Sequence, residues 1–297
     1  MSNKTIGFLS LTLTALILGS FGIWVRILST DLTIYQQIFF RNFIALLISI
    51  ALLILAKRKI SIKDTSKKYL FIYSIAFPVS VICFTVSILL TKIAITLFAL
   101  YVGSIISSFI IGTYFFHEKI TINKIISIIL IFIGLILLTF PISNSNINLG
   151  IIFGLLSGIA EAIGNAFRKH LGEKIDRIFL VTIAMISGII LSLALVLINH
   201  ESLLFFTQIS LISWLTGIIF GILLFVVSYL TIVGFQYVEL GPGTLIYSSE
   251  ILFGALFGIL FFSEYLNLKE VVGGLLIFLS IMIPYINTKS PQHLIKQ

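Results

Sequence analysis

Charged residues are scarce in this chain of 297 residues: only 10% are Asp, Glu, Lys or Arg, whereas 59% are hydrophobic. A soluble domain carries about 25% charged residues, because polar side chains must cover the surface that faces water. The composition therefore excludes an ordinary soluble globular protein, a disordered chain and a basic nucleic-acid binder, although the net charge is +8.

Residues that bind metals or act as nucleophiles are also sparse. A single cysteine, Cys83, excludes an internal disulfide and a cysteine-based zinc site, and the four histidines lie far apart at positions 117, 170, 200 and 293. The chain contains no His-Glu-x-x-His, no P-loop and no Gly-x-Ser-x-Gly motif. We therefore expect no metal site, no cofactor and no enzymatic activity.

Long apolar runs, such as 125–140 and 215–234, make up most of the chain. A helix needs roughly 20 mostly apolar residues to cross a bilayer, whereas a barrel strand would alternate apolar and polar residues. The runs therefore predict an all-α integral membrane protein. Charged residues, Asn, Pro and Gly divide it into ten expected transmembrane helices, at about 6–28, 34–56, 69–91, 93–116, 121–141, 149–170, 178–198, 211–236, 241–262 and 269–286.

The basic residues are distributed unevenly among the connections between these helices. With a cytoplasmic N-terminus, fifteen of the 19 lysines and arginines fall in cytoplasmic segments, and only Lys92 and Lys269 fall in exterior ones. Cytoplasmic loops carry such an excess in membrane proteins. The distribution predicts that both termini are cytoplasmic and supports an even number of spans. It also explains the net charge, so we expect no nucleic acid as a partner.

The second half of the chain repeats a pattern of the first half, 146 residues later. The segment 115–118 (FFHE) corresponds to 261–264 (FFSE), and Tyr101 corresponds to Tyr247. In both halves a helix ends at this segment, and another begins after a tight turn. Because five helices are an odd number, the second copy enters the membrane from the opposite side. We expect two inverted five-helix repeats, residues 1–145 and 146–297, as in secondary transporters that bind substrate between the copies.

On these features the chain resembles the drug/metabolite transporter superfamily, specifically its EamA-type ten-helix members. The resemblance rests on the two halves, on the Glu118 and Glu264 segments, and on Arg41 early in the second helix (FFRNF, 39–43). It implies a carrier of amino acids, metabolites, drugs or related small solutes. Many family copies carry a proline in the fourth or ninth helix. Here Gly103 and Ser249 occupy those positions, so that a helix break would lie elsewhere.

Span six carries a row of polar side chains. Ser157, Glu161, Asn165 and Arg168 follow one another at intervals of four, four and three residues, which places them on one face of a helix. Ionisable residues inside a membrane are costly and mark functional sites. We predict that this face lines a polar cavity, where Glu161 binds a cationic group, a proton or both. The alternative is that Glu161 pairs with an arginine and only holds two helices together.

Spans four and nine carry a second, repeated face. Tyr101 and Ser104 in span four correspond to Tyr247 and Glu250 in span nine. We predict that these faces form two walls of the central site, with the tyrosines stacking on or hydrogen-bonding to the substrate. Glu250, like Glu161, is a candidate for proton coupling. Glycines on the same faces, such as Gly254 and Gly258, are more typical of helix packing.

Three further groups of charged residues have simple alternative roles. Arg41 is either a counter-ion for one of the buried acids or a ligand for a substrate carboxylate, which its fork of donors fits; alternatively it extends to the membrane interface. Arg26, near the end of span one, is expected to extend to the interface. Glu118 and Glu264 are each expected to cap the N-terminus of the helix that follows; the alternative is that they gate or orient the turn on each side of the membrane.

These features predict a secondary transporter of small polar metabolites, such as amino acids or related solutes, which works by proton-coupled efflux and alternating access. We expect a monomer or homodimer in the plasma membrane, the inner membrane of a bacterial cell, with the lipid bilayer and a small-molecule substrate as partners. One alternative is an uptake carrier for a metabolite or a nucleotide-like cation. Another is a receptor or assembly subunit without transport, whose polar faces would be subunit contacts.

Overall fold

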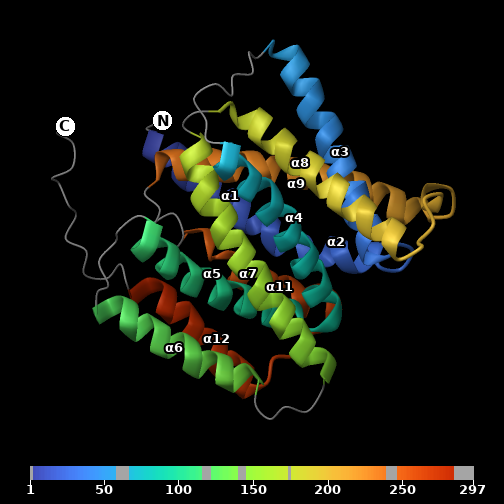
Figure 1. Ribbon diagram of the computed structural model, residues 1–297. Helices are drawn as coiled ribbons and strands as arrows, with labels where there is room; N and C mark the ends of the chain where they lie inside the picture. The colour runs from blue at the N-terminus through green and yellow to red at the C-terminus, as the bar shows by residue number, and fades with distance from the viewer. Residues whose placement is uncertain are drawn as a thin grey trace, which may run out of the picture.

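The computed structural model describes residues 3–57, 67–115, 122–139, 145–172, 175–238 and 246–283, and these residues are all helical or in short connections. The all-α class predicted from the sequence is confirmed for them. The helices are α1 (Asn3–Gly19), α2 (Phe21–Leu28), α3 (Ile34–Leu55), α4 (Lys67–Leu90), α5 (Ile93–Phe115), α6 (Ile122–Thr139), α7 (Ser145–Gly172), α8 (Arg177–Ile198), the 3-10 turn η1 (Phe205–Thr207), α9 (Leu211–Tyr237), α11 (Glu250–Phe262) and α12 (Leu268–Met282) (Figure 1).

These helices correspond to the ten predicted spans. Within the described residues, seven stretches are long and apolar enough to cross a bilayer, and the first of them, Thr5–Leu28, joins α1 and α2. Shorter apolar cores lie in α6 (Ile125–Leu137) and α11, and α12 supplies another 15 helical residues. The outward faces carry exposed Leu, Ile and Phe side chains, such as Phe8, Leu47 and Ile190. Such a surface is suited to the lipid bilayer, because the apolar lipid chains offer no hydrogen bonds to polar side chains.

Helix packing repeats between the two halves of the chain. Helices α4 and α5 pack on α7, and their counterparts α9 and α11 pack on α1. Three further contacts join equivalent helices directly, namely α3 with α8, α5 with α11, and α6 with α12. Helices α6 and α12 lie side by side along one edge of Figure 1. A two-fold relation between inverted repeats produces this pattern, because it exchanges each helix with its counterpart. The two-repeat architecture is confirmed, whereas the boundary between residues 145 and 146 stays a prediction.

Glycines bring α5 and α7 into backbone contact. A Cβ atom on Gly158 would overlap the carbonyl oxygen of Leu100, and one on Gly103 would overlap that of Leu155. Small residues permit such close approach between membrane helices, where van der Waals contact replaces hydrophobic driving force. The helix that carries the polar row of span six is therefore held firmly against α5.

Two of the predicted spans are interrupted. Span one breaks at Ser20, whose hydroxyl donates to the Ile17 carbonyl at 2.6 Å. Span nine is described from residue 246, and its regular helix α11 begins only at Glu250, after a turn at Ser248 and Ser249. The Ser249 hydroxyl donates to the Ile246 carbonyl at 2.6 Å, so a side chain competes with the backbone for the helical acceptor. Pro242 lies outside the described residues.

Candidate functional site

A cavity of about 90 Å³ lies between α4, α5 and α7 on one side and α1, α2, α9 and α11 on the other, with α3 at one end. It has room for a few water molecules. The residues from the predicted site that line it are Arg41, Ser157, Glu161, Asn165, Tyr247 and Glu250. The structure thus brings together most of the side chains singled out in the sequence, from α3, α7, α11 and the residues just before α11.

The polar row of α7 runs along one wall of this cavity. The Ser157 hydroxyl donates to the Ser80 carbonyl at 2.9 Å, which ties α7 to α4. Asn165 and Arg168 follow toward the C-terminal end of the helix, and the half-exposed Arg168 lies over the Tyr73 ring at 5.9 Å. The four-four-three spacing places these residues on one face because it approximates the helical period of 3.6.

Glu161 has one satisfied and one unsatisfied carboxylate oxygen. The Tyr247 hydroxyl donates to its Oε1 at 3.0 Å, whereas its Oε2 is buried and has no hydrogen-bond partner in the part of the chain that the structure describes. Among the described residues Glu161 forms no ion pair with an arginine, so the helix-pairing alternative has no contact to support it. The unsatisfied oxygen leaves this acid able to accept a hydrogen bond from a ligand.

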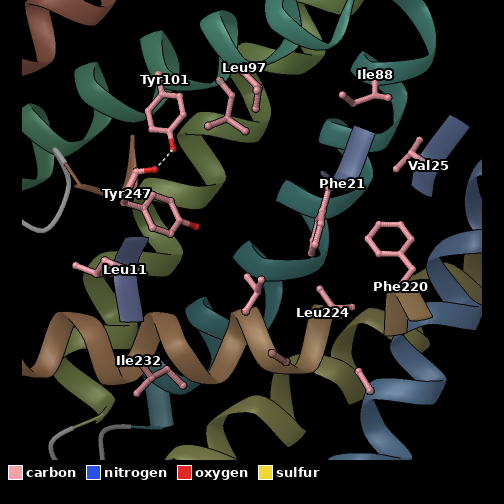
Figure 2. Packing of buried hydrophobic residues seen from close by; sticks show 14 of the residues in the cluster. Leu11, Phe21, Val25, Ile88, Leu97, Tyr101, Phe220, Leu224, Ile232 and Tyr247 are labelled. Carbon is pink, nitrogen blue, oxygen red and sulfur yellow. Dashed lines mark hydrogen bonds between the residues drawn. The ribbon is translucent and has the colours of Figure 1, made fainter. Parts of the chain in front are cut away.

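Glu250 is held by the tyrosine of the opposite repeat. The Tyr101 hydroxyl donates to Glu250 Oε2 at 2.9 Å and also lies 3.1 Å from the Tyr247 carbonyl, as the dashed line in Figure 2 shows. Glu250 is the first residue of α11 and is 3% exposed. A carboxylate is favoured at this helix end by the helix dipole. Tyr101 therefore lies behind the cavity wall and supports Glu250, although we predicted that it would line the site.

Ser104 does not line the cavity either. It is buried at the contact between α5 and α7, where a Cβ atom on Gly158 would lie 2.7 Å from its backbone nitrogen. Although Ser104 corresponds to Glu250 in the repeat, α5 turns this position toward α7. Gly254 likewise packs against Leu97 of α5, in the helix-packing role expected for the glycines.

Arg41 is fully enclosed by the protein and does not extend to the membrane interface. Its Nη2 donates to the Thr85 hydroxyl at 2.8 Å, and its guanidinium lies over the Phe220 ring at 4.5 Å. Among the residues that the structure describes, its Nε and Nη1 have no hydrogen-bond partner, and it forms no ion pair with Glu161 or Glu250. The Arg41 guanidinium thus has unused hydrogen-bond donors at the cavity that Glu161 and Glu250 also line.

Aromatic side chains form the apolar part of the cavity wall. Phe21, Phe77 and Phe84 line it, and the ring of Phe21 meets that of Phe220 edge to face, with centroids 4.8 Å apart (Figure 2). Sequence reasoning missed these residues because aromatic residues occur in every span, so that their presence alone does not mark a site. It also missed Ser80, for which Pro78 in the interior of α4 was a signal, since proline removes a helical hydrogen bond there.

The charged residues near the helix ends differ from their predicted roles. Arg26 does not extend into the interface: its Nη2 lies 2.5 Å from Glu264 Oε1. Glu264 does not cap α12, since Asn267 and Glu270 cap that helix with a reciprocal capping box. Instead Glu264 accepts a hydrogen bond of 2.9 Å from the backbone nitrogen of Ile93, the first residue of α5. Tertiary contact thus decides which helix it caps. Glu118 lies outside the described residues.

The comparisons with known proteins address the family and the fold. The model of the EamA-like transporter family matches the chain twice, over residues 5–140 and 148–286. No curated protein matches. A crystal structure described only as that of a protein has a TM-score of 0.68 and 12% identity, covers 96% of this chain and 98% of its own, and shows the shared fold alone.

The two family matches cover nearly the whole chain, one in each half, and the structure contains the paired five-helix halves with a polar cavity between them. The chain therefore belongs to the EamA-like transporter family and is a multi-pass membrane protein that transports small solutes.

Proposed function

We propose that the protein is a secondary carrier that exports a small zwitterionic metabolite, such as an amino acid, in exchange for protons. Its location is the inner membrane of a bacterial cell, with both termini in the cytoplasm, as the distribution of basic residues favours. One chain encloses the whole cavity, so a monomer is a complete carrier, whether or not two copies associate. Its task is transport rather than catalysis.

The observation that supports this proposal most directly is that one cavity contains both unused hydrogen-bond donors, on a cation, and an unused acceptor, on an acid. Arg41 offers Nε and Nη1, and Glu161 offers Oε2, and each of these buried atoms lacks a partner. A buried group left unsatisfied costs about 1–3 kcal/mol, and more if it is charged. A substrate carboxylate would remove the cost at Arg41, and a substrate ammonium would remove the cost at Glu161. Phe21 and Phe77 would contact its apolar part.

The size of the cavity supports movement during transport. Ligand pockets commonly have about 300–1,000 Å³, whereas this one has about 90 Å³. Entry of a metabolite therefore requires that α4, α5 and α7 move away from α1, α9 and α11. A polar-lined space that can widen supports a carrier better than an assembly subunit, for which the polar faces would be subunit contacts.

The two buried acids support proton coupling, because acids inside membrane bundles serve as proton relays in carriers. Tyr247 connects them: its hydroxyl donates to Glu161, and its carbonyl lies beside the Tyr101 hydroxyl that holds Glu250. A proton bound at either acid would change what this tyrosine contacts. In the proposed cycle an incoming proton replaces the ammonium of the substrate.

The test uses purified protein in liposomes. A thermal-shift screen over amino acids, polyamines, nucleosides and quaternary amines first selects a ligand. Its movement is then driven by an imposed pH gradient, in the wild type and in the Glu161→Gln and Glu250→Gln variants. Glu201→Gln is the matched control, because Glu201 lies in a connection outside the spans and accepts a hydrogen bond from Thr33.

We expect the gradient to drive transport in the wild type and in Glu201→Gln, and each of the two buried-acid variants to lose this response. If both buried-acid variants retain gradient-driven transport, the proton role is wrong. If zwitterions give neither a thermal shift nor transport while another class does, the substrate class is wrong.

A further inference from the structure

Arg26 and Glu264 form an ion pair at one end of the helix bundle, which we call the latch end. Arg26 Nη2 lies 2.5 Å from Glu264 Oε1, and the Arg26 guanidinium lies over the Phe262 ring at 4.7 Å. The side chains are 20% and 9% exposed. Because Glu264 is nearly buried, its charge is only weakly screened by water, and the pair is stronger than an exposed one.

Both members of the pair also bind the junction between α4 and α5. Arg26 Nη2 donates to the carbonyl of Thr91 at 2.8 Å, and Glu264 Oε2 accepts from the nitrogen of Ile93 at 2.9 Å. Thr91 follows the last residue of α4, and Ile93 is the first residue of α5. The pair therefore satisfies one acceptor at the end of α4 and one donor at the start of α5, which helix ends leave unpaired.

The local structure of α11 directs Glu264 toward this junction. Ser263 has a positive φ of 52°, and the Glu264 nitrogen donates back to the Gly258 carbonyl at 3.2 Å. A Cβ atom on Gly258 would come within 2.5 Å of Glu264 Oε2. The chain thus turns back on the end of α11, and glycine leaves room for the carboxylate to lie there.

These contacts cross between the two groups of helices that flank the cavity. Thr91 and Ile93 lie at the junction of α4 and α5, which pack on α7. Arg26 belongs to α2 and Glu264 follows the end of α11, on the side of α1 and α9. The proposed movement separates these two groups. At the latch end it cannot occur while Arg26 and Glu264 keep their contacts.

Along α7 the cavity lies away from the latch end. A Cβ atom on Gly150, near the start of α7, would lie 2.7 Å from the Thr91 side chain, so the start of α7 lies at the latch end. Along α7 the cavity is lined from Ser157 to Arg168, toward the opposite end of that helix. At about 1.5 Å per residue this wall is roughly 16 Å long, and the half-exposed Arg168 lies at its far end.

We propose that Arg26 and Glu264 are an electrostatic latch that holds this end of the carrier closed, and that the pair must separate before the cavity opens there. The proposal rests on alternating access in the proposed function and identifies the contact that controls one of its two states. The charge distribution in the sequence places the latch end outside the cell.

A neighbouring ion pair provides a matched control. Lys92 Nζ lies 2.7 Å from Glu270 Oε2, at the same end of the molecule. This pair links the start of α5 to α12, and α12 itself packs on α5 and α6. Lys92 Nζ also donates to the Tyr265 carbonyl at 2.8 Å, and Glu270→Gln leaves this contact in place. That variant therefore removes an ion pair of the same kind without releasing α4 and α5 from α2 and α11.

The experiment measures access to the cavity in membrane vesicles without substrate. In a Cys83→Ala background, Ser228→Cys on α9 places a thiol at the cavity wall, because Ser228 lines it. A membrane-impermeant, positively charged methanethiosulfonate is applied to each face of the membrane. In a separate variant, Ser29→Cys identifies the latch-end face, because Ser29 is exposed just beyond α2. Glu264→Gln, Arg26→Gln and Glu270→Gln are each combined with the Ser228→Cys reporter.

We expect Glu264→Gln and Arg26→Gln to raise the labelling rate from the latch-end face by about tenfold or more, since loss of a state-specific contact shifts a two-state population. Glu270→Gln should leave the rate unchanged. The latch is wrong if the labelling rate from the latch-end face is the same in all three variants. It is also wrong if neither Glu264→Gln nor Arg26→Gln raises that rate. Arg26→Gln decides the question if Glu264→Gln does not fold, because it leaves the cap of α5 intact.

Failure of the latch and failure of the proposed function give different results. If labelling is unaffected while the wild type still transports solute in liposomes, the latch is wrong and the carrier stands. If labelling responds as expected while the wild type transports none of the screened solutes, the gate operates and the proposed substrate class is wrong.

Discussion

At the scale of single residues, Arg26 and Arg41 differ in how they use their guanidinium groups. Arg26 uses its guanidinium in an ion pair and a backbone hydrogen bond, whereas Arg41 leaves two donor atoms unpaired in a fully enclosed position. The first arrangement stabilises the fold. The second costs stability, and such a cost is expected where function requires the group.

This difference predicts opposite effects of the same substitution. Arg41→Gln should abolish transport while leaving the free energy of unfolding unchanged or higher, because it removes a buried charge whose donors are only partly satisfied. Arg26→Gln should lower that free energy by about 1.5–3 kcal/mol, the range for hydrogen bonds to charged groups. Denaturant unfolding in detergent, run beside liposome transport, measures both. A large loss of stability in Arg41→Gln would contradict the assignment.

Asp31 in the connection between α2 and α3 gives a prediction about pH. The hydroxyl and backbone nitrogen of Ser210 both donate to its carboxylate, at 2.6 and 2.9 Å, and these hydrogen bonds lower the pKa of Asp31 below its ordinary value of 3.8. A lowered pKa in the folded state means that the stabilisation is present above that ordinary value and is lost as the pH falls through the folded value.

We therefore expect Asp31→Asn to lower the melting temperature at pH 7, and we expect this difference to shrink at a pH well below 3.8, where the wild-type carboxyl also takes up a proton. Thermal unfolding at the two pH values tests this. A difference of the same size at both would show that the hydrogen-bond geometry matters and the charge does not.

At the scale of the elements, glycine contacts decide how closely two helices approach. Gly158 lies against the backbone of α5, whereas Gly164, two turns further along α7, has no atom nearer than 3.9 Å to an added Cβ. Both lie inside the same helix, where alanine is intrinsically favoured over glycine by about 1 kcal/mol. The surroundings therefore decide the sign of the effect.

Gly158→Ala should destabilise the protein by about 1–3 kcal/mol, the usual cost of overpacking, because the Leu100 backbone cannot move aside as a side chain would. Gly164→Ala should be neutral or mildly stabilising. The melting temperatures of the two variants in the same detergent give the comparison. Equal melting temperatures would mean that α5 and α7 do not touch as described.

At the scale of the whole molecule, an even number of spans follows from pairing each helix with a counterpart in the other half. α3 meets α8, α5 meets α11 and α6 meets α12, which an inverted repeat of five helices produces. The distribution of basic residues then predicts cytoplasmic termini at both ends.

Reporter fusions test this topology. A reporter active only in the cytoplasm should work when fused before residue 1 and after residue 297, and it should fail when inserted at Ser29, which is exposed beyond the end of α2. Activity at only one terminus would mean an odd number of spans and would contradict the inverted repeat.

Much of the site was predictable because the spacing of residues along one helix determines which of them share a face. Ser157, Glu161 and Asn165 share a cavity wall because they share a helical face, and that face can be read from spacing alone. Tyr101 and Ser104 were predicted to line the cavity by the same reasoning, yet α5 directs them toward Glu250 and toward α7. Spacing identifies a face of a helix but does not determine which neighbour that face meets.

The sequence by itself determined the class, the spans, the repeat and the family, because these depend on the transfer of side chains between water and lipid and on periodicities within a few turns. Only the tertiary structure decided that Glu264 caps α5 rather than α12, that Arg26 pairs with it, and that span nine is interrupted before Glu250. Those outcomes depend on contacts between residues more than 150 positions apart or on competition for one carbonyl. Such contacts are set by how whole helices pack.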